Sequence, residues 1–170
     1  AFGSRYAHLA GTGFHCAHAV LLLLRHTIPT TQELLDAASA FIGGTVLKGL
    51  TCSAYTAGVM AVGMKIGDIE DSHLRVIRMM ATMLIGGDAF DDRMNKFNKV
   101  MNMNIGNRMS EWFTRQFGST LCRELTQCDF SCGKGVRRFI EKGCVATCRT
   151  IADEVARQAE RIIEREGTGW

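Results

Sequence analysis

The sequence predicts an all-α fold, a single-domain helical bundle of about five to seven helices that spans residues 1–170. Segments whose apolar residues recur at helical spacing fill most of the chain. Glycine clusters separate these segments, and the chain contains one proline, Pro29. With 170 residues, of which 46% are hydrophobic, the chain is long and apolar enough to bury its own core. No internal repeat or linker is visible in the sequence, so one domain accounts for the chain.

Three helices are predicted in the first part of the chain. The first covers residues 14–28 and ends because Pro29 disfavours α geometry at the residue before it. The second starts at the capping box Thr30-Thr31-Gln32-Glu33 and stops at Gly43-Gly44. The third runs over residues 52–67, and its small side chains make it slender enough for neighbouring helices to approach closely. These small residues are Ala57, Gly58, Ala61 and Gly63.

Further helices are predicted in the second part of the chain. Asp71 or Ser72 caps a fourth helix that continues to residue 85. Residues 89–117 form one or two helices, with a break near Gly106. A long final helix covers residues 135–165, where apolar and charged residues alternate at helical spacing.

Charge and hydropathy exclude two classes of partner. Twenty Lys and Arg residues against 17 Asp and Glu leave a formal net charge of +3, and no block of five like charges occurs, so no nucleic-acid partner is expected. The longest apolar run, residues 19–24, is far shorter than the roughly 20 residues that a bilayer requires. We therefore expect a soluble protein without a membrane span. Its compartment, cytoplasm or periplasm, stays open.

Methionine is concentrated in one part of the chain. Eight of the nine methionines lie between Met64 and Met109. Flexible thioethers fill irregular cores and are frequent on apolar contact surfaces, and we favour core or partner contacts over copper binding. Met79, Met80 and Met83 lie among apolar residues at core spacing. Because the stretch from residue 79 to 109 exceeds what one core needs, we predict a homodimer.

The cysteines carry the strongest chemical signal. Their number, seven, is odd, so disulfide bonds cannot use all of them. They are Cys16, Cys52, Cys122, Cys128, Cys132, Cys144 and Cys148, and five of them fall between residues 122 and 148. Cys144 and Cys148 lie four residues apart on one face of the last predicted helix. Thiolates are suited to zinc and to iron–sulfur clusters, but a free cysteine is also a common buried packing residue.

Two cysteines lie at predicted helix starts. Cys52 opens the third helix and Cys16 lies near the start of the first. Unpaired backbone N–H groups and the positive end of the helix dipole favour a thiolate there. His15 and His18 flank Cys16 and are expected to be surface or cap residues rather than ligands, with His15 as the best exception. The sequence contains no Cys-x-x-Cys-His motif, so no covalent haem is expected.

Three segments carry a resemblance to a known family. They read Phe-His-Cys-Ala-His-Ala-Val from residue 14, Gly-Leu-Thr-Cys-Ser-Ala-Tyr-Thr-Ala-Gly from residue 49, and Phe-Gly-Ser-Thr-Leu-Cys-Arg-Glu-Leu from residue 117. The chain resembles the redox-active family defined by four spaced cysteines, the second of which lies in a Cys-Gly-Ala-x-x-Gly motif. It is also similar to the iron–sulfur helical domain of split-Soret cytochromes. The third segment is the most specific of the three.

The resemblance implies a site. By position, the family cysteines correspond to Cys16, Cys52, Cys122 and Cys148, with Cys144, Cys128 and Cys132 as alternates. These residues would bind an iron–sulfur cluster, expected to be [2Fe-2S]. Ser53 replaces the motif glycine, and Ala57 stands at its final glycine, with Gly58 one residue later. The insert over residues 68–105 is longer than the family leads us to expect, and we expect it to contact a partner.

Three functions follow from these patterns. The first is an electron-transfer protein whose cysteines bind an iron–sulfur cluster and pass electrons to a redox partner protein. The second is a metal-free thiol–disulfide redox protein, and the third is an oligomeric interaction module with packed cysteines. Whether the chain is an enzyme stays open. The helix starts should bring the site to one end of the bundle, where four cations would either dock an acidic partner or be ordinary solvated charges. These cations are Arg123, Lys134, Arg137 and Arg138.

Overall fold

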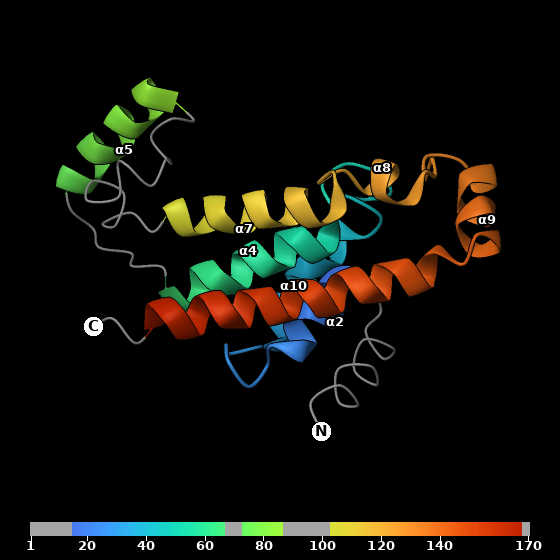
Figure 1. Ribbon diagram of the computed structural model, residues 1–170, viewed down its shortest axis with the longest axis horizontal. Helices are drawn as coiled ribbons and strands as arrows, with labels where there is room; N and C mark the ends of the chain where they lie inside the picture. The colour runs from blue at the N-terminus through green and yellow to red at the C-terminus, as the bar shows by residue number, and fades with distance from the viewer. Residues whose placement is uncertain (1–14, 67–72, 87–102, 168–170) are drawn as a thin grey trace.

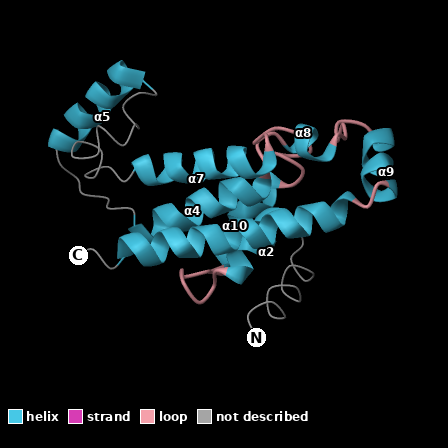
Figure 2. Cartoon of the chain, in the orientation of Figure 1, coloured by secondary structure: helices cyan, strands magenta, loops and turns pink. Residues whose placement is uncertain are grey.

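Helices make up most of the described chain, and this confirms the all-α prediction (Figure 1, Figure 2). The computed structural model describes residues 15–66, 73–86 and 103–167. Its α-helices are α2 (Cys16–Leu23), α3 (Gln32–Ala38), α4 (Ser53–Ile66), α5 (His73–Ile85), α7 (Met103–Phe117), α8 (Cys122–Thr126), α9 (Gly133–Glu141) and α10 (Cys144–Gly167), and the 3-10 helix η1 spans Ser39–Phe41. Within these ranges no helix is long and apolar enough to cross a bilayer.

The slender helix α4 lies at the centre of the bundle and contacts α2, α7 and α10 (Figure 1). Ala57 and Ala61 are completely buried on it. A Cβ atom at Gly58 would lie 2.6 Å from Val155 Cγ1 and 2.8 Å from Met109 Cε. Because those distances are shorter than van der Waals contact, the absence of a side chain at Gly58 lets α10 and α7 approach. The sequence predicted this close approach.

The first two predicted helices form, but both end earlier than predicted. α2 ends at Leu23, and turns continue the chain to Ile28, so Pro29 is not the residue that ends it. α3 begins at Gln32, where the Thr31 hydroxyl accepts a hydrogen bond from the Leu34 N–H at 3.3 Å. This N-cap lies one residue later than a capping box that starts at Thr30 would place it. η1 then occupies the remainder of the second predicted helix.

Two predicted helix boundaries in the second half are wrong. α7 continues through Gly106 without a break, because a single glycine weakens a helix by only about 1 kcal/mol. The predicted final helix is instead two helices, α9 and α10. Gly143 separates them with a φ of +65°, a left-handed conformation that favours glycine and ends α9. α9 lies at one end of the molecule, beyond the end of α10 (Figure 1).

Helix α5 lies beyond the opposite end of the bundle from α9 (Figure 1). Its apolar side chains were expected at core positions, and for several of them this is wrong. Met83 is 74% exposed and Leu84 is 89% exposed. Val76, Ile77, Met80 and Ile85 are exposed as well. The predicted cap of this helix at Asp71 or Ser72 and residues 87–102 of the insert lie outside the described residues.

Candidate functional site

A short backbone pairing brings two cysteines from distant parts of the chain together. The Cys52 N–H donates to the Thr120 carbonyl at 2.7 Å, and the Cys122 N–H donates to the Leu50 carbonyl at 2.7 Å. Thr51 and Leu121 form an isolated antiparallel bridge between the same two segments. Each segment then enters a helix, α4 after Cys52 and α8 at Cys122. The pairing therefore sets two helix starts, with one cysteine at each, side by side.

A loop with left-handed backbone conformation packs against this pairing. Residues 43–47 all have positive φ, between 48° and 71°, and the segment includes the β-branched residues Thr45 and Val46. A Cβ atom at Gly44 would lie 2.7 Å from Cys122 Cβ, so only glycine lets the loop reach the start of α8. The sequence predicted that Gly43-Gly44 stops a helix, but it did not predict the left-handed run that follows.

Two further cysteines, Cys16 and Cys148, form a coupled pair between α2 and α10. Cys16 is the first residue of α2, and Cys148 lies one turn into α10. Side-chain hydrogen bonding with Cys148 lowers the pKa of the Cys16 thiol, while the same interaction and burial raise the pKa of Cys148. Cys16 is therefore the more acidic thiol of the pair.

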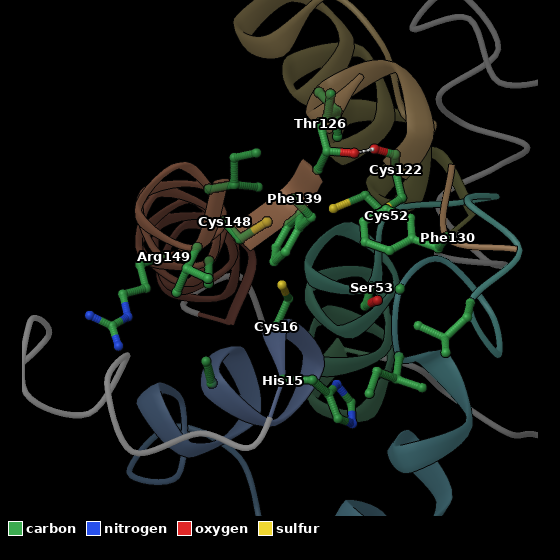
Figure 3. A pocket seen from close by; sticks show the side chains of 18 of the residues that line it. His15, Cys16, Cys52, Ser53, Cys122, Thr126, Phe130, Phe139, Cys148 and Arg149 are labelled. Atoms are coloured by element: carbon green, nitrogen blue, oxygen red, sulfur yellow. Dashed lines mark hydrogen bonds between the residues drawn. The ribbon is translucent and has the colours of Figure 1, made fainter. Parts of the chain in front are cut away.

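All four of these cysteines line one cavity of about 580 Å³ (Figure 3). Its other lining residues are mostly apolar and come from the loop over residues 42–47 and from α8, α9 and α10. They include Ile42, Leu47, Leu125, Phe130, Val136, Phe139, Val145 and Ile151. Cys16 and Cys148 face the pair Cys52 and Cys122 across the interior (Figure 3). The predicted site residues therefore meet in space, and their role as ligands stays a prediction.

Burial and mutual repulsion disfavour thiolates on the other side of this cavity. Burial is the main reason why the pKa of Cys52 is raised to about 11 and that of Cys122 to about 12. The charge of Cys16 raises both values further, and Cys52 adds to the shift of Cys122. In the absence of a positive charge the cavity holds at most one thiolate readily. A bound cation would instead favour the thiolate forms of these cysteines.

His15 lies beside the cavity but carries no positive charge near neutral pH. Burial and the nearby His18 lower the pKa of His15 to about 4. The two imidazole rings stack with centroids 4.1 Å apart, and His18 Nε2 lies 2.7 Å from the Leu35 carbonyl oxygen. A neutral imidazole is the form that binds metals. His15 as a further ligand stays a prediction.

The three alternate cysteines do not line the cavity. Cys128 and Cys144 belong to a small buried cluster with Cys122 and Phe130, which also line the cavity. Cys132 is exposed at the start of α9. Over the described residues, no three His, Cys, Asp or Glu side chains lie close enough together to hold one metal ion. The structure thus separates Cys148 from Cys144, which the sequence left open.

Sequence reasoning missed several residues of the site. Thr126 and Phe139 line the cavity, and the Thr126 hydroxyl donates to the Cys122 carbonyl at 2.8 Å. Arg149 also lines it, although its guanidinium points away from the interior (Figure 3). The only available signal for Arg149 was its place directly after Cys148. The four predicted cations, Arg123, Lys134, Arg137 and Arg138, are all exposed on α8 and α9.

Three helix starts and the second turn of α10 present four cysteines to one mostly apolar cavity, and this defines a cysteine-rich all-α protein. The chain belongs to the family described as putative redox-active protein (C_GCAxxG_C_C), whose profile matches residues 14–162. This match confirms the family resemblance read from the cysteine motifs. No curated protein and no solved structure gives a significant match. The similarity to split-Soret cytochromes stays a prediction.

Proposed function

We propose that this protein transfers electrons through an iron–sulfur cluster, [2Fe-2S], that binds in the cavity. The observation that carries the proposal is that Cys16, Cys52, Cys122 and Cys148, and none of the other three cysteines, line one apolar cavity. Four thiolates complete the ligand set of such a cluster. When bound, the cluster supplies one-electron redox chemistry that the side chains lack.

The donor set of the cavity fits a two-iron cluster better than a single ion. A [2Fe-2S] cluster takes two thiolates on each iron, so its ligands need to gather in pairs rather than around one point. The cavity offers two pairs, Cys16 with Cys148 and Cys52 with Cys122. This arrangement also agrees with the finding that no three metal-binding side chains gather around one point in the described ranges.

The residues of the chain have separate tasks in this proposal. The pairing of residues 49–52 with 120–123 fixes the backbone on either side of Cys52 and Cys122, which limits reorganisation when the charge of the site changes. Apolar side chains such as Phe130 and Phe139 exclude water from the sulfur atoms. Cys16, as the most acidic thiol of the four, would be the first to lose its proton and bind.

A second candidate function, metal-free thiol–disulfide exchange, uses the same pair. The lowered pKa of Cys16 and its neighbour Cys148 are features of a nucleophilic and a resolving cysteine. In that reaction, the Cys16 thiolate would attack a substrate disulfide, form a mixed disulfide and release the first substrate thiolate. Cys148 would then attack the Cys16 sulfur, form the Cys16–Cys148 bond and release the second substrate thiolate. The cluster is favoured because this exchange assigns no role to Cys52 and Cys122.

We further propose that the active form is a homodimer that exchanges electrons with a partner protein. The exposed apolar side chains of α5 form a continuous surface, and its proposed occupant is α5 of a second copy of the chain. The length and amphipathic pattern of this helix suit an isologous helix pair. If the protein were instead an interaction module without redox chemistry, the α5 surface would still bind a partner, and the cavity would have no function.

The decisive experiment is a visible absorption spectrum of protein purified without oxygen. Charge-transfer bands are expected from the wild type and should be lost, together with iron and sulfide, in Cys52→Ser. The matched control, Cys128→Ser, changes a buried cysteine outside the cavity and should retain them. A colourless wild-type protein with reactive Cys16 would favour thiol–disulfide exchange. Equal loss of iron in both variants would contradict the assignment of the ligands.

A further inference from the structure

A second pair of cysteines does not line the cavity and lies in a small buried cluster next to it. Cys128 follows α8 and is 3% exposed, and Cys144 is the first residue of α10 and is 7% exposed. Phe130 and Cys122 complete the cluster, and Val136 and Phe139 of α9 pack against it. The family motif uses four cysteines and the proposed function uses the same four, so neither accounts for this pair.

The two thiols point at one acceptor. Cys128 Sγ donates to the Thr126 carbonyl at 3.3 Å, and Cys144 Sγ donates to the same carbonyl at 3.7 Å. One carbonyl oxygen thus holds both sulfur atoms side by side, although the two residues lie on different elements.

We propose that Cys128 and Cys144 form a second redox site, a dithiol that closes reversibly to a disulfide across the ends of α9. The two residues flank this helix, so the bond would join the start of the loop after α8 to the start of α10 and enclose α9. Its oxidant is a small-molecule disulfide of the glutathione class. The bond uses none of the four cysteines that line the cavity.

The reaction balances as two thiol–disulfide exchanges. The Cys144 thiolate attacks one sulfur atom of the small disulfide, a mixed disulfide forms, and the first small thiolate leaves. The Cys128 thiolate then attacks the Cys144 sulfur, the intramolecular bond forms, and the second small thiolate leaves. Two electrons pass from the cysteine pair to the small disulfide, and the two cysteine protons end on the two small thiols.

The location of α9 explains how a small disulfide reaches two buried thiols. α9 covers the pair through Val136 and Phe139 and lies at the end of the bundle, beside the main core (Figure 1). The left-handed Gly143 separates it from α10. A local opening of α9 can therefore expose the pair while the core around α4 stays folded.

The test is to equilibrate the reduced full-length chain with oxidised glutathione, block the remaining thiols with iodoacetamide, and digest the product with trypsin. Cleavage beside Lys134 and Lys142 releases residues 124–134, which contain Cys128 and Cys132, and residues 143–149, which contain Cys144 and Cys148. The expected product is a single linked species of these two peptides. Fragmentation of that species should find the blocking group on Cys132 and Cys148.

Matched variants distinguish the pair from its neighbours. Cys128→Ser and Cys144→Ser should each abolish the linked species, whereas Cys132→Ser, which removes the exposed cysteine of the same peptide, should leave its yield unchanged. Far-ultraviolet circular dichroism checks that each variant is folded. A linked species joined through Cys132 or Cys148 would overturn the proposal. So would glutathione adducts on Cys128 and Cys144 without a bond between them, or no oxidation of either residue at excess oxidant.

Discussion

The acidity of Cys16 depends on one neighbour, Cys148. In reduced, metal-free protein we therefore expect Cys148→Ala to raise the pKa of Cys16. A thiolate is the nucleophile, so a lowered pKa keeps Cys16 reactive as the pH falls below the ordinary thiol value of about 8.5. The variant should lose this reactivity at a higher pH than the wild type does. The pH profile of iodoacetamide alkylation at Cys16, read by mass spectrometry, measures the change.

Cys144→Ala is the control for this measurement, because it removes a cysteine one turn earlier on the same helix. The profile of Cys16 should stay unchanged in it, since Cys144 hydrogen-bonds in the other cluster. An unchanged profile in Cys148→Ala would mean that the acidity of Cys16 arises from the helix start alone, and an equal shift in both variants would contradict a specific role of Cys148.

At the scale of single residues, the sequence predicts the residue types that form the site. It predicts less well which individual residues lie close together. Cys144 and Cys148 lie one turn apart on the same helix, so the helical pattern of the sequence places both on the same face. Their separation into two clusters depends on α9, which packs against Cys144 and leaves Cys148 facing the cavity. The turn that positions α9 is a tertiary feature that residue spacing does not encode.

At the scale of elements, the close contacts of α4 lead to a prediction about its glycines. Gly58→Ala should lower the free energy of unfolding by about 1–3 kcal/mol, because the new methyl group would overlap Val155 and Met109. Gly63→Ala is the matched control on the same helix. No heavy atom lies within 4 Å of its added Cβ, so it should raise the free energy of unfolding by up to about 1 kcal/mol through helix propensity.

Urea denaturation of the wild type and the two variants measures both changes. Stabilisation by both substitutions would mean that α7 and α10 can move away from α4 without loss. A destabilised Gly63→Ala would show instead that a methyl group at this exposed position is not tolerated for a reason that the described structure does not contain.

Helix boundaries show where local sequence patterns are sufficient. The Thr31 cap and the limits of α4 follow from side chains within a few residues, and they were predicted to within about one residue. The division between α9 and α10 was missed because Lys142-Gly143 resembles a tolerated glycine within a helix. The chain turns there at Gly143, whose φ of +65° is left-handed and ends α9.

For the whole molecule, the exposed side of α5 predicts the oligomeric state. Light scattering should find a particle of twice the 18.7 kDa chain mass at micromolar concentration. Met83→Glu should produce the monomer, because it places a charge within the proposed apolar contact. Met64→Glu makes the same change at an exposed methionine of α4 and should stay dimeric. A wild-type monomer would contradict the homodimer.

The basic residues of α8 and α9 predict how a redox partner approaches. Arg137 and Arg138 are exposed on α9, and Arg123 is exposed on α8. Reduction by an acidic ferredoxin-like donor should slow as salt rises, because the Debye length falls to about 10 Å at 0.1 M ionic strength. Arg137→Glu should slow the reaction at low salt, and Arg25→Glu, on an exposed residue after α2, should not. Stopped-flow rates independent of salt would contradict electrostatic docking.

The cavity joins Cys16, close to the start of the described chain, to Cys148 on its last helix, and this has a consequence for biosynthesis. At the roughly 5–20 residues per second of translation, on the order of 10 s separates the synthesis of these two cysteines. Until α10 emerges from the ribosome, Cys16, Cys52 and Cys122 lack the helix that closes their site. Closure of the cavity is therefore a late event in the synthesis of each chain, and its first three cysteines are most open to oxidation before α10 is made.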